Sequence, residues 1–216
     1  MKSKKDVSIV IADDHPILLK GLHDQLTSNG YNVIGQAANG MQALELILTL
    51  SPTIALLDID MPLLNGFEVI KTAIDKKIST KFIILSFHKE TEYIAQAKTL
   101  NINGYLLKED SFMEIENCIL SVWEGNSYFS KSFNNSSLLY ADNELRKLQY
   151  LTPSETTILK LIAQQTSTTD IANSLSVSKR TIEKHRSNII SKLELDRETN
   201  TLTKWTLNNK SIILDL

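Results

Sequence analysis

Residues 54–66 read IALLDIDMPLLNG, and this stretch determines how the first half of the chain is interpreted. A short apolar run precedes Asp58, and the segment closes at Asn65-Gly66. An apolar run too short for a helix and ended by turn residues is typical of a strand buried on both faces of a parallel sheet. Asp58 then stands at the carboxyl end of the strand, where open α/β sheets bind ligands. The alternative is an aspartate that only caps the next turn.

Apolar and amphipathic segments alternate on both sides of this stretch. Strands are predicted at 7–12, 31–37, 54–58, 82–86 and 104–107, and helices at 15–29, 40–50, 68–76, 90–100 and 111–124. This alternation favours an α/β fold, a doubly wound five-stranded parallel sheet with right-handed crossovers. Such a sheet brings the carboxyl ends of its strands to one edge.

Polar residues follow four of the predicted strands: Asp13 and Asp14, then Asp58, Ser86 and Lys108. Three neighbouring carboxylates repel one another unless a cation lies among them. Carboxylate oxygens and waters suit Mg²⁺, which pairs readily with phosphate. A lysine and a serine hydroxyl suit phosphoryl oxygens. We therefore expect a site for Mg²⁺ and a phosphoryl group at this edge.

Residues 7–124 resemble the receiver domain of two-component response regulators, which has a flavodoxin-like fold. The resemblance rests on the DD pair at 13–14, on D-x-x-M-P-x-x-x-G at 58–66, on Ser86, and on GYLLK at 104–108. It implies that Asp58 accepts a phosphoryl group from a phosphohistidine of a sensor histidine kinase. It implies no enzyme activity beyond this chemistry at Asp58.

The resemblance also assigns roles around the phosphoacceptor. Mg²⁺ would be held by Asp14 directly, by Asp13 through water, by Asp58 and by the backbone carbonyl of Asp60. The phosphoryl group would pair with Lys108 and attract Ser86, and Tyr105 would be the aromatic switch residue that moves with it.

Two residues after the fourth strand stand out. Phe87 occupies a position where many receivers have a small residue, so we expect its bulk to restrict access to the acyl phosphate and Phe87→Ala to change the dephosphorylation rate. His88 has no histidine or cysteine partner nearby in the sequence, and a solvated loop residue is preferred to a metal ligand.

Length and composition fit two modest domains. The chain has 216 residues, of which 42% are hydrophobic and 22% charged, and its one cysteine, Cys118, is expected to be core packing in a reducing compartment. The apolar run at 7–12 is too short for a signal peptide, and no run approaches a membrane span, so we expect a cytoplasmic protein without a membrane partner. Residues 1–130 hold 11 Lys and Arg against 16 Asp and Glu, whereas residues 131–216 hold 12 against 9. The basic second part suggests nucleic-acid binding.

The segment 126–150 is rich in Ser and Asn and then becomes charged. This composition predicts a linker, with residues 143–149 helical. We expect a receiver domain at 1–128, a linker at 129–148 and a second domain at 149–216.

The second domain begins with a dense helix start. Thr152 as N-cap, Pro153 at the first helical position and Glu155 form a capping box. A short helix after Ser167 and a longer one after Ser178 follow, the latter running from 179 to about 193. Short helix, tight turn and longer basic helix indicate a small all-α helix-turn-helix domain.

The last of these helices carries five basic residues and one acid between positions 179 and 192. A solvated helix face is the alternative, but the second helix of a helix-turn-helix is the one that docks in the major groove. Residues 151–195 also resemble the LuxR-type DNA-binding domain, which together with a receiver gives the NarL/FixJ arrangement. The expected contacts to double-stranded DNA are Lys179, Arg180, Thr181, Glu183, Lys184, Arg186, Ser187, Asn188 and Lys192.

Within this set, Glu183 stands where some relatives carry lysine. A carboxylate favours accepting a hydrogen bond from cytosine and repels phosphate, so a lysine-type guanine contact is not expected there. Lys179, Arg180, Arg186 and Lys192 are better assigned to phosphates. In the tail at 198–208, dimer contact and core packing are equal alternatives for Trp205.

The leading hypothesis is a response regulator transcription factor in which phosphorylation of Asp58 controls homodimerisation and binding to a two-fold DNA site. A phosphorylation-independent DNA-binding regulator is one alternative. The other is a phosphatase of the haloacid-dehalogenase type, because Asp58 and Asp60 form a DxD pair. That alternative explains neither Asp13-Asp14 nor the second domain.

Overall fold

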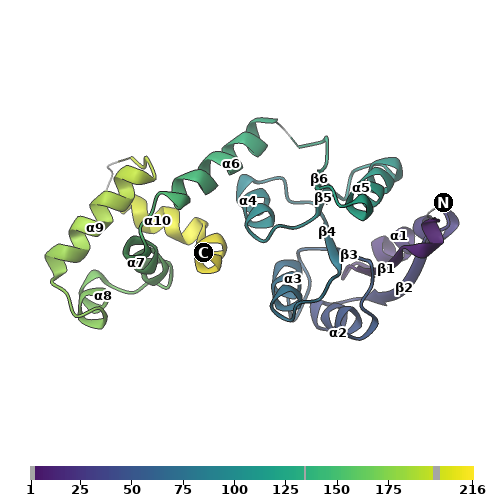
Figure 1. Cartoon of the computed structure of the whole chain (residues 1–216), viewed down its shortest axis with the longest axis horizontal. Helices are drawn as coiled ribbons and strands as arrows, with labels where there is room; N and C mark the ends of the chain where they lie inside the picture. Colours follow the sequence, from purple (N-terminus) through teal and green to yellow (C-terminus); the bar gives the residue numbers. More distant parts are fainter. Residues whose placement is uncertain (1–2, 134, 197–199) are drawn as a thin grey trace. The chain divides into compact units, whose positions relative to one another are not determined.

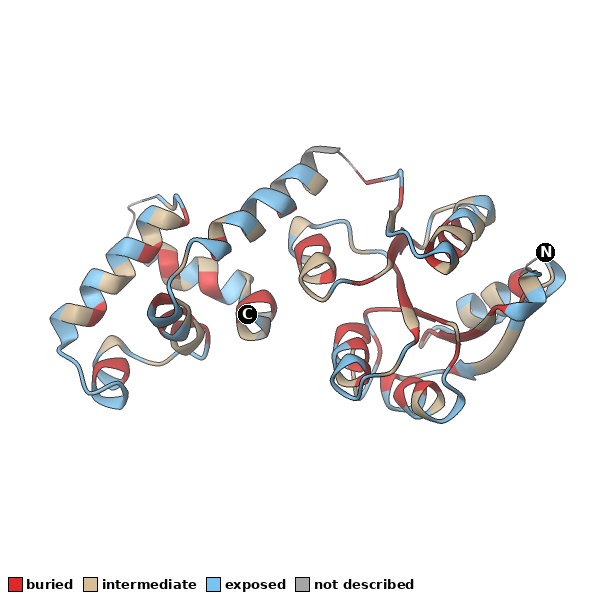
Figure 2. Cartoon of the chain, in the orientation of Figure 1, coloured by how far each residue is buried: buried red, intermediate tan, exposed pale blue. Residues whose placement is uncertain are grey.

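The computed structural model describes residues 3–133, 135–196 and 200–216 of the chain. Contacts divide it into two compact units, Met1–Lys89 with Leu100–Asn134 and Glu90–Thr99 with Asn135–Leu216. Each unit encloses its own buried residues (Figure 2). No helix in the described ranges is long and apolar enough to cross a membrane.

The first unit is built on a parallel sheet, ordered β2-β1-β3-β4-β5-β6 (Figure 1). The strand order reverses beside β1, so the carboxyl ends of β1 and β3 meet at the switch point where such sheets bind ligands. The predicted strands are confirmed with small shifts of their ends. The six strands are β1 (Ser8–Ala12), β2 (Asn32–Ala37), β3 (Ile54–Leu57), β4 (Lys81–Ser86), β5 (Gly104–Leu107) and β6 (Tyr128–Phe129).

The sixth strand was not expected from the sequence. It is two residues long and extends the parallel sheet beside β5, with Tyr128 opposite Gly104 and Phe129 opposite Tyr105. A strand of two residues has no periodicity that sequence patterning detects. The prediction of five strands is therefore one short of the observed six.

In its described residues the first unit also contains the helices α1 (Pro16–Ser28), α2 (Gly40–Leu50), α3 (Gly66–Asp75) and α5 (Phe112–Glu124), after a short 3-10 turn at Lys4–Asp6. All four residues of β3 are buried, as expected for a strand covered on both faces. On one face Ile9, Ile11 and Leu56 form a cluster with residues of α1 and α5. Cys118 is fully buried in that cluster, which confirms its packing role.

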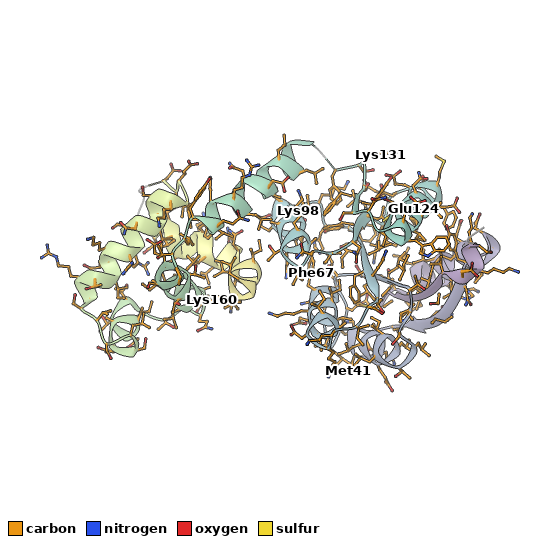
Figure 3. All side chains as sticks on the ribbon, in the orientation of Figure 1. Met41, Phe67, Lys98, Glu124, Lys131 and Lys160 are labelled. Atoms are coloured by element: carbon orange, nitrogen blue, oxygen red, sulfur yellow. The ribbon has the colours of Figure 1, made fainter. Side chains whose placement is uncertain are left out.

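The second unit is helical: α4 (Thr91–Thr99), α6 (Asn135–Gln149), α7 (Pro153–Ala163), α8 (Thr168–Ser174), α9 (Lys179–Lys192), α10 (Thr201–Asn208) and α11 (Lys210–Asp215). The ammonium of Lys98 on α4, labelled in Figure 3, lies 2.6 Å from a carboxylate oxygen of Asp142 on α6. The all-α second domain with a helix-turn-helix is confirmed.

Helix α6 begins earlier than the expected helix at 143–149. The Ser- and Asn-rich composition favours a linker, but Ala141 and Leu148 are buried, and this packing outweighs the local preference.

Helix α11 was also not expected. Residues 198 and 199 of the predicted tail lie outside the described part, and its remainder forms α10.

The predicted helix starts of the second domain are confirmed. Thr152 and Glu155 form a reciprocal capping box at α7. Ser167 accepts from the backbone of Asp170, and Ser178 accepts from the backbone of Thr181. These caps satisfy backbone donors that the first helical turn leaves free.

The loop from β3 to α3 is compact because Gly66 has no side chain. Its backbone N–H donates to the carbonyl of Ile59 at 2.9 Å. A Cβ at Gly66 would lie 2.2 Å from the carbonyl oxygen of Asp58. Asn65 and Glu68 then cap α3 reciprocally. The position of Asp58 therefore depends on the approach of helix α3.

We expect Gly66→Ala to destabilise the protein by about 1–3 kcal/mol, since the added methyl forces the backbone of Asp58 to move. Gly21→Ala in α1 is the matched control, because nothing lies within 4 Å of its Cβ position. Its expected effect is a gain of about 0.5–1 kcal/mol from helix propensity. Urea unfolding of both variants measures the difference, and equal effects would contradict the close approach at Gly66.

Candidate functional site

Backbone hydrogen bonds hold the predicted site residues at one edge of the sheet. The N–H of Asp58 donates to the carbonyl of Ala12 at 2.9 Å, and the N–H of Lys108 donates to the carbonyl of Ser86 at 2.9 Å. The ends of neighbouring strands are thus tied together just beyond the sheet. The side chains that the sequence placed on separate strands are brought into one cluster.

The centre of this cluster is Lys108. Its ammonium lies 2.7 Å from Asp13 Oδ2 and 2.8 Å from Asp58 Oδ2. All three side chains are almost completely buried. The other oxygen of Asp58, Oδ1, accepts the N–H of Ile59 at 2.7 Å. A lysine bridging two buried carboxylates gives a site that is negative overall and shielded from water.

The electrostatics of Asp58 and Lys108 follow from this burial. Burial raises the pKa of the Asp58 carboxyl, and the ion pair with Lys108 offsets only part of that rise. For Lys108, burial acts against the charged form, but the hydrogen-bonding and Coulombic pull of Asp13 and Asp58 outweighs it and raises the ammonium pKa. The pKa of Asp58 is thus raised by burial itself, whereas the pKa of Lys108 is raised by the two carboxylates enclosed with it.

Ser86 and Tyr105 lie beside this cluster. Ser86 is 1% exposed, and its hydroxyl accepts the N–H of His88 at 3.3 Å. Tyr105 is fully buried, and its hydroxyl donates to the carbonyl of His88 at 3.1 Å. Its ring also packs edge-on against Phe133. The tyrosine therefore points inward and is joined to the loop that follows Ser86.

His88 differs from its sequence-based expectation. It lies in a loop as expected, but its side chain is only 24% exposed, and Nε2 lies 2.7 Å from Asp60 Oδ2. The carboxylate of Asp60 is 69% exposed and is engaged by this imidazole. The pair connects the loop after β3 with the loop after β4. Sequence reasoning missed it because the partners are 28 residues apart.

The acidic residues are spaced for a metal ion. Ligand atoms of Asp13, Asp14, His15 and Asp58 all lie within 4.8 Å of one another. Asp14 Oδ1 is a buried atom with no hydrogen-bond partner in the described ranges. An oxygen-rich donor set with an unsatisfied carboxylate oxygen fits a hard divalent ion such as Mg²⁺. His15 was not among the expected ligands.

Phe87 is 61% exposed, and its ring centroid lies 5.2 Å from the ammonium of Lys108. The ring thus stands over the charged centre, as its position after Ser86 suggested. Its effect on dephosphorylation stays a prediction.

A groove of about 220 Å³ borders the site between α1 and α5. Asp13 and Lys108 form part of its lining, together with Leu22 and Phe112. Ile17 on its rim is 85% exposed. An apolar groove with charged groups at one end can receive another surface while leaving the cluster within reach.

In the second unit, α9 has one buried and one exposed face. Ile182 and Ile189 are buried, as is Leu193 at its C-terminal end. The exposed face combines cationic and hydrogen-bonding side chains around one acid. Its members are Lys179, Arg180, Glu183, Lys184, Ser187 and Asn188.

Four of the expected DNA contacts have partners within the unit, and one of them, Ser187, donates its hydroxyl to the carbonyl of Glu183 at 3.1 Å. Lys192 lies 2.7 Å from Glu155 on α7, a buried carboxylate whose pKa is lowered: burial acts to raise it, but Lys192 and Thr152 outweigh that. Arg186 donates to the hydroxyl of Thr203 at 3.2 Å and is half-buried, which lowers its pKa. Thr181 lies 2.7 Å from the Ser178 hydroxyl. The contacts of Lys192 and Arg186 hold α9 against α7 and α10, whereas that of Thr181 is made with the N-cap residue of α9 itself. None of them tests the DNA contacts.

These features define an α/β domain with a buried cluster of two aspartates and a lysine, followed in the chain by a helix-turn-helix domain. Residues 9–119 match the model of the response regulator receiver domain, and residues 149–204 match that of the bacterial regulatory proteins of the luxR family. The chain belongs to the transcriptional response regulators that combine a receiver domain with a LuxR-type DNA-binding domain.

Known relatives cover nearly the full length. The chain is 32% identical to the uncharacterized transcriptional regulatory protein YhcZ of Bacillus subtilis strain 168, over 94% of this chain and 99% of that protein. It is 30% identical to the nitrate/nitrite response regulator protein NarL of Escherichia coli K12, over 90% and 93%. The fold resembles that of the RcsB response regulator of Salmonella typhimurium, with a TM-score of 0.58, 22% identity, and 93% and 98% of the two chains covered.

We expect Asp58→Asn to stabilise the protein at pH 7. Burial raises the folded-state pKa of Asp58 above its unfolded value, so stability is lost as the pH rises through the folded pKa and the carboxyl ionises. The asparagine amide of the variant does not ionise and has no such cost. The stability advantage of Asp58→Asn over wild type should therefore shrink as the pH falls toward about 4, the ordinary range for a carboxyl.

Urea unfolding at several pH values measures this, with Asp75→Asn, an exposed position on α3, as the control. A gain in the stability of Asp58→Asn that does not depend on pH, or a loss of its stability at pH 7, would contradict the prediction that ionised Asp58 destabilises the fold.

Proposed function

We propose that the chain is a phosphorylation-controlled transcription regulator in which Asp58 accepts a phosphoryl group and thereby changes DNA binding. The observation that carries this proposal is the buried bridge from Lys108 to Asp13 and Asp58, with Ser86 beside it. Burying a charge cluster of this kind lowers the stability of the folded protein. Proteins keep such clusters mainly at functional sites, so the cluster indicates one.

The transfer begins when a carboxylate oxygen of Asp58 attacks the phosphorus of a phosphohistidine on a sensor histidine kinase. An O–P bond forms, the N–P bond breaks, and the imidazole leaves. Lys108 donates to a phosphoryl oxygen and offsets its negative charge. Ser86 turns its hydroxyl toward another phosphoryl oxygen. Phosphoryl transfer depends mainly on such positioning and charge neutralisation, and we propose no other enzymatic turnover.

A bound Mg²⁺ would neutralise charge between the phosphoryl oxygens and the carboxylates. Asp13, Asp14, Asp58 and the backbone carbonyl of Asp60 would hold it. The side chain of Asp60 does not compete for that role, because His88 engages it. The same contact argues against Asp60 as the acid/base group of a phosphatase.

The groove between α1 and α5 is the proposed docking surface for the kinase. Its apolar lining and the exposed Ile17 offer buried area to a partner, and Asp13 and Lys108 at its end place that partner beside Asp58. Cytoplasmic location follows from this proposal, since both the kinase domain and the DNA must be within reach.

For DNA, we propose that α9 docks in the major groove of a duplex. Lys179, Arg180 and Lys184 are exposed and suit phosphates or guanine, whereas Ser187 and Asn188 suit base edges. Glu183 accepts from cytosine. Thr181, Arg186 and Lys192 also have partners within the domain, so we assign them to the backbone of the duplex near the edges of the interface.

Regulation couples the two domains. We propose a receiver at 1–128, a linker at 129–148 that includes most of α6, and a DNA-binding domain at 149–216. Phosphorylation moves Ser86 and the buried Tyr105, which share the loop at His88, and the phosphorylated protein forms a homodimer on two half-sites. For Trp205, which is partly buried, dimer contact and core packing both stay open.

The test is labelling with radioactive acetyl phosphate in the presence of Mg²⁺. Wild-type protein should take up no more than one phosphoryl group per chain, and Asp58→Ala should take up none. Asp75→Ala, an exposed carboxylate on α3, serves as the control and should label normally. Multiple turnover of phosphate esters that survives Asp13→Ala would instead support the phosphatase.

Phe87→Ala should shorten the lifetime of the acyl phosphate by about two- to tenfold, because removing a ring over Lys108 admits water to the phosphoryl group; a shielding contact of about 0.5–1.5 kcal/mol corresponds to this range. Decay of the label after the donor is removed gives the rate. Met113→Ala, an exposed side chain on α5, is the control. An unchanged acyl-phosphate lifetime in Phe87→Ala would show that the ring does not shield the phosphoryl group.

Lys179→Ala should weaken binding to a duplex and lower the salt dependence of log K by about one unit of slope, as expected for one lost phosphate contact. Lys204→Ala, exposed on α10, is the charge-matched control and should change neither value. Fluorescence anisotropy over a range of salt concentrations measures both.

The same assay separates the two regulatory hypotheses. Tighter binding of the phosphorylated wild type, absent in Asp58→Ala, supports control by phosphorylation. Equal affinity of both proteins with and without phosphodonor at one salt concentration would establish the phosphorylation-independent regulator.

A further inference from the structure

The first residues of the expected linker are built into the first unit and lie against Tyr105. Strand β6 extends the sheet beside β5, with Phe129 opposite Tyr105. The N–H of Ser130 then donates to the carbonyl of Tyr105 at 2.8 Å. The segment Leu100–Asn134 belongs to the first unit by its contacts, although the composition of its last part predicted a linker. The chain therefore leaves the first unit beside the aromatic residue whose movement the proposed function requires.

The ring of Phe133 packs against the ring of Tyr105. The two ring centroids lie 5.0 Å apart with an interplanar angle of 75°, an edge-on arrangement, and the ring of Phe129 lies 6.4 Å from that of Tyr105 at 48°. Both distances fall in the range of favourable aromatic pairs, which stabilise beyond the area that they bury. Tyr105 is fully buried, and Phe133 is 5% exposed. A Tyr105 ring that changes its position must therefore displace Phe133 or lose this contact.

Hydrogen bonds fix the segment that carries Phe133. The N–H of Phe133 donates to the carbonyl of Ser130 at 3.1 Å, and the hydroxyl of Ser132 donates to Asp110 Oδ1 at 2.7 Å. The other carboxylate oxygen of Asp110 accepts the N–H of Leu107, the last residue of β5, at 2.8 Å. The segment is thus attached to β5 and also to the loop that follows β5.

We propose that Phe133 is a positioning residue, which holds the ring of Tyr105 inward and whose displacement transmits a movement of that ring to α6. Phe133 stands two positions before the first residue of α6, so it connects the first unit to that helix along the chain. This inference rests on the proposed function, in which Tyr105 moves after phosphorylation, and it names the residue that responds to the movement. Transmission requires an element with two arrangements, and the pair of Tyr105 and Phe133 is that element.

A purely structural role for Phe133 makes a different prediction. A ring that only fills the core would lower stability when it is replaced, as any buried phenylalanine does, but would leave the response of DNA binding to phosphorylation unchanged. Phe82→Leu is the matched control for Phe133→Leu, because Phe82 is 3% exposed and lies near the amino end of β4, at the opposite end from Ser86. The response to phosphorylation therefore separates the two roles.

The first measurement is nitration of the full-length protein by tetranitromethane, followed by mass spectrometry. Tyr31, which is 4% exposed and lies beside β2, is the internal reference. We expect Phe133→Leu to be nitrated at Tyr105 about two- to tenfold faster relative to Tyr31, the range that corresponds to loss of one aromatic pair. Phe82→Leu should keep the wild-type ratio. An unchanged ratio in Phe133→Leu would overturn the positioning role.

The second measurement is the ratio of DNA affinities with and without acetyl phosphate and Mg²⁺, by fluorescence anisotropy with one duplex at one salt concentration. At equal labelling of Asp58, this ratio should be about two- to tenfold smaller in Phe133→Leu than in wild type, because the aromatic contact no longer transmits the movement. Phe82→Leu should keep the wild-type ratio. An unchanged ratio in Phe133→Leu, or an equal loss in Phe82→Leu, would overturn the transmission to α6.

Failure of the proposed function has a different signature. If wild-type protein is not labelled at Asp58, or if labelling leaves its DNA affinity unchanged, the proposed function is wrong and the transmission to α6 is wrong with it. The nitration ratio does not depend on phosphorylation and tests the contact of Phe133 with Tyr105 separately. If wild type responds to phosphorylation and Phe133→Leu responds equally, only the role of Phe133 is wrong.

Discussion

The placement of Lys108 between Asp13 and Asp58 is the interaction on which the rest of this account depends. Two carboxylates buried side by side would repel each other strongly, and the ammonium at 2.7 Å and 2.8 Å is the cation that lets both remain in the fold. The three residues come from the ends of β1, β3 and β5, so the bridge requires the strand order that brings those ends together. The site therefore depends on the strand order, and the folded state must keep these buried charges paired.

The resident ammonium also explains why the site can respond to an incoming group. A metal ion and a phosphoryl group each attract a different part of the bridge: the ion attracts Asp13 and Asp58, and the phosphoryl oxygens attract Lys108. Binding of either one would change the ion pairs among Lys108, Asp13 and Asp58. Ser86 and Tyr105 are joined to the loop at His88, so a change at the phosphoryl position reaches that loop through direct contacts. The loop leads in sequence into α4.

Much of this was predictable because the relevant patterns are local. The buried run before Asp58, the helix caps at Thr152 and Ser178, and the apolar face of α9 are properties of neighbouring residues, and the structure confirms them. What escaped prediction was either too short or too distant in sequence. Strand β6 has two residues, α6 is stabilised by burial of Ala141 against a polar composition, and the pairs of His88 with Asp60 and of Lys192 with Glu155 join residues far apart in the chain. His15 follows the acidic pair directly in the sequence, and only its residue type could have indicated that its ring lies beside the carboxylates.

The most direct test of the central claim is a Mg²⁺ titration of Lys108→Ala beside wild type, with Lys20→Ala, exposed on α1, as the charge-matched control. If Lys108 is the resident cation of the two carboxylates, its removal leaves Asp13 and Asp58 without a competing charge. We expect Lys108→Ala to bind Mg²⁺ about fivefold more tightly or better, because a change of about 1 kcal/mol in the charge interactions of the site corresponds to this ratio. Affinity that is unchanged, or weaker than that of wild type and Lys20→Ala, would contradict it.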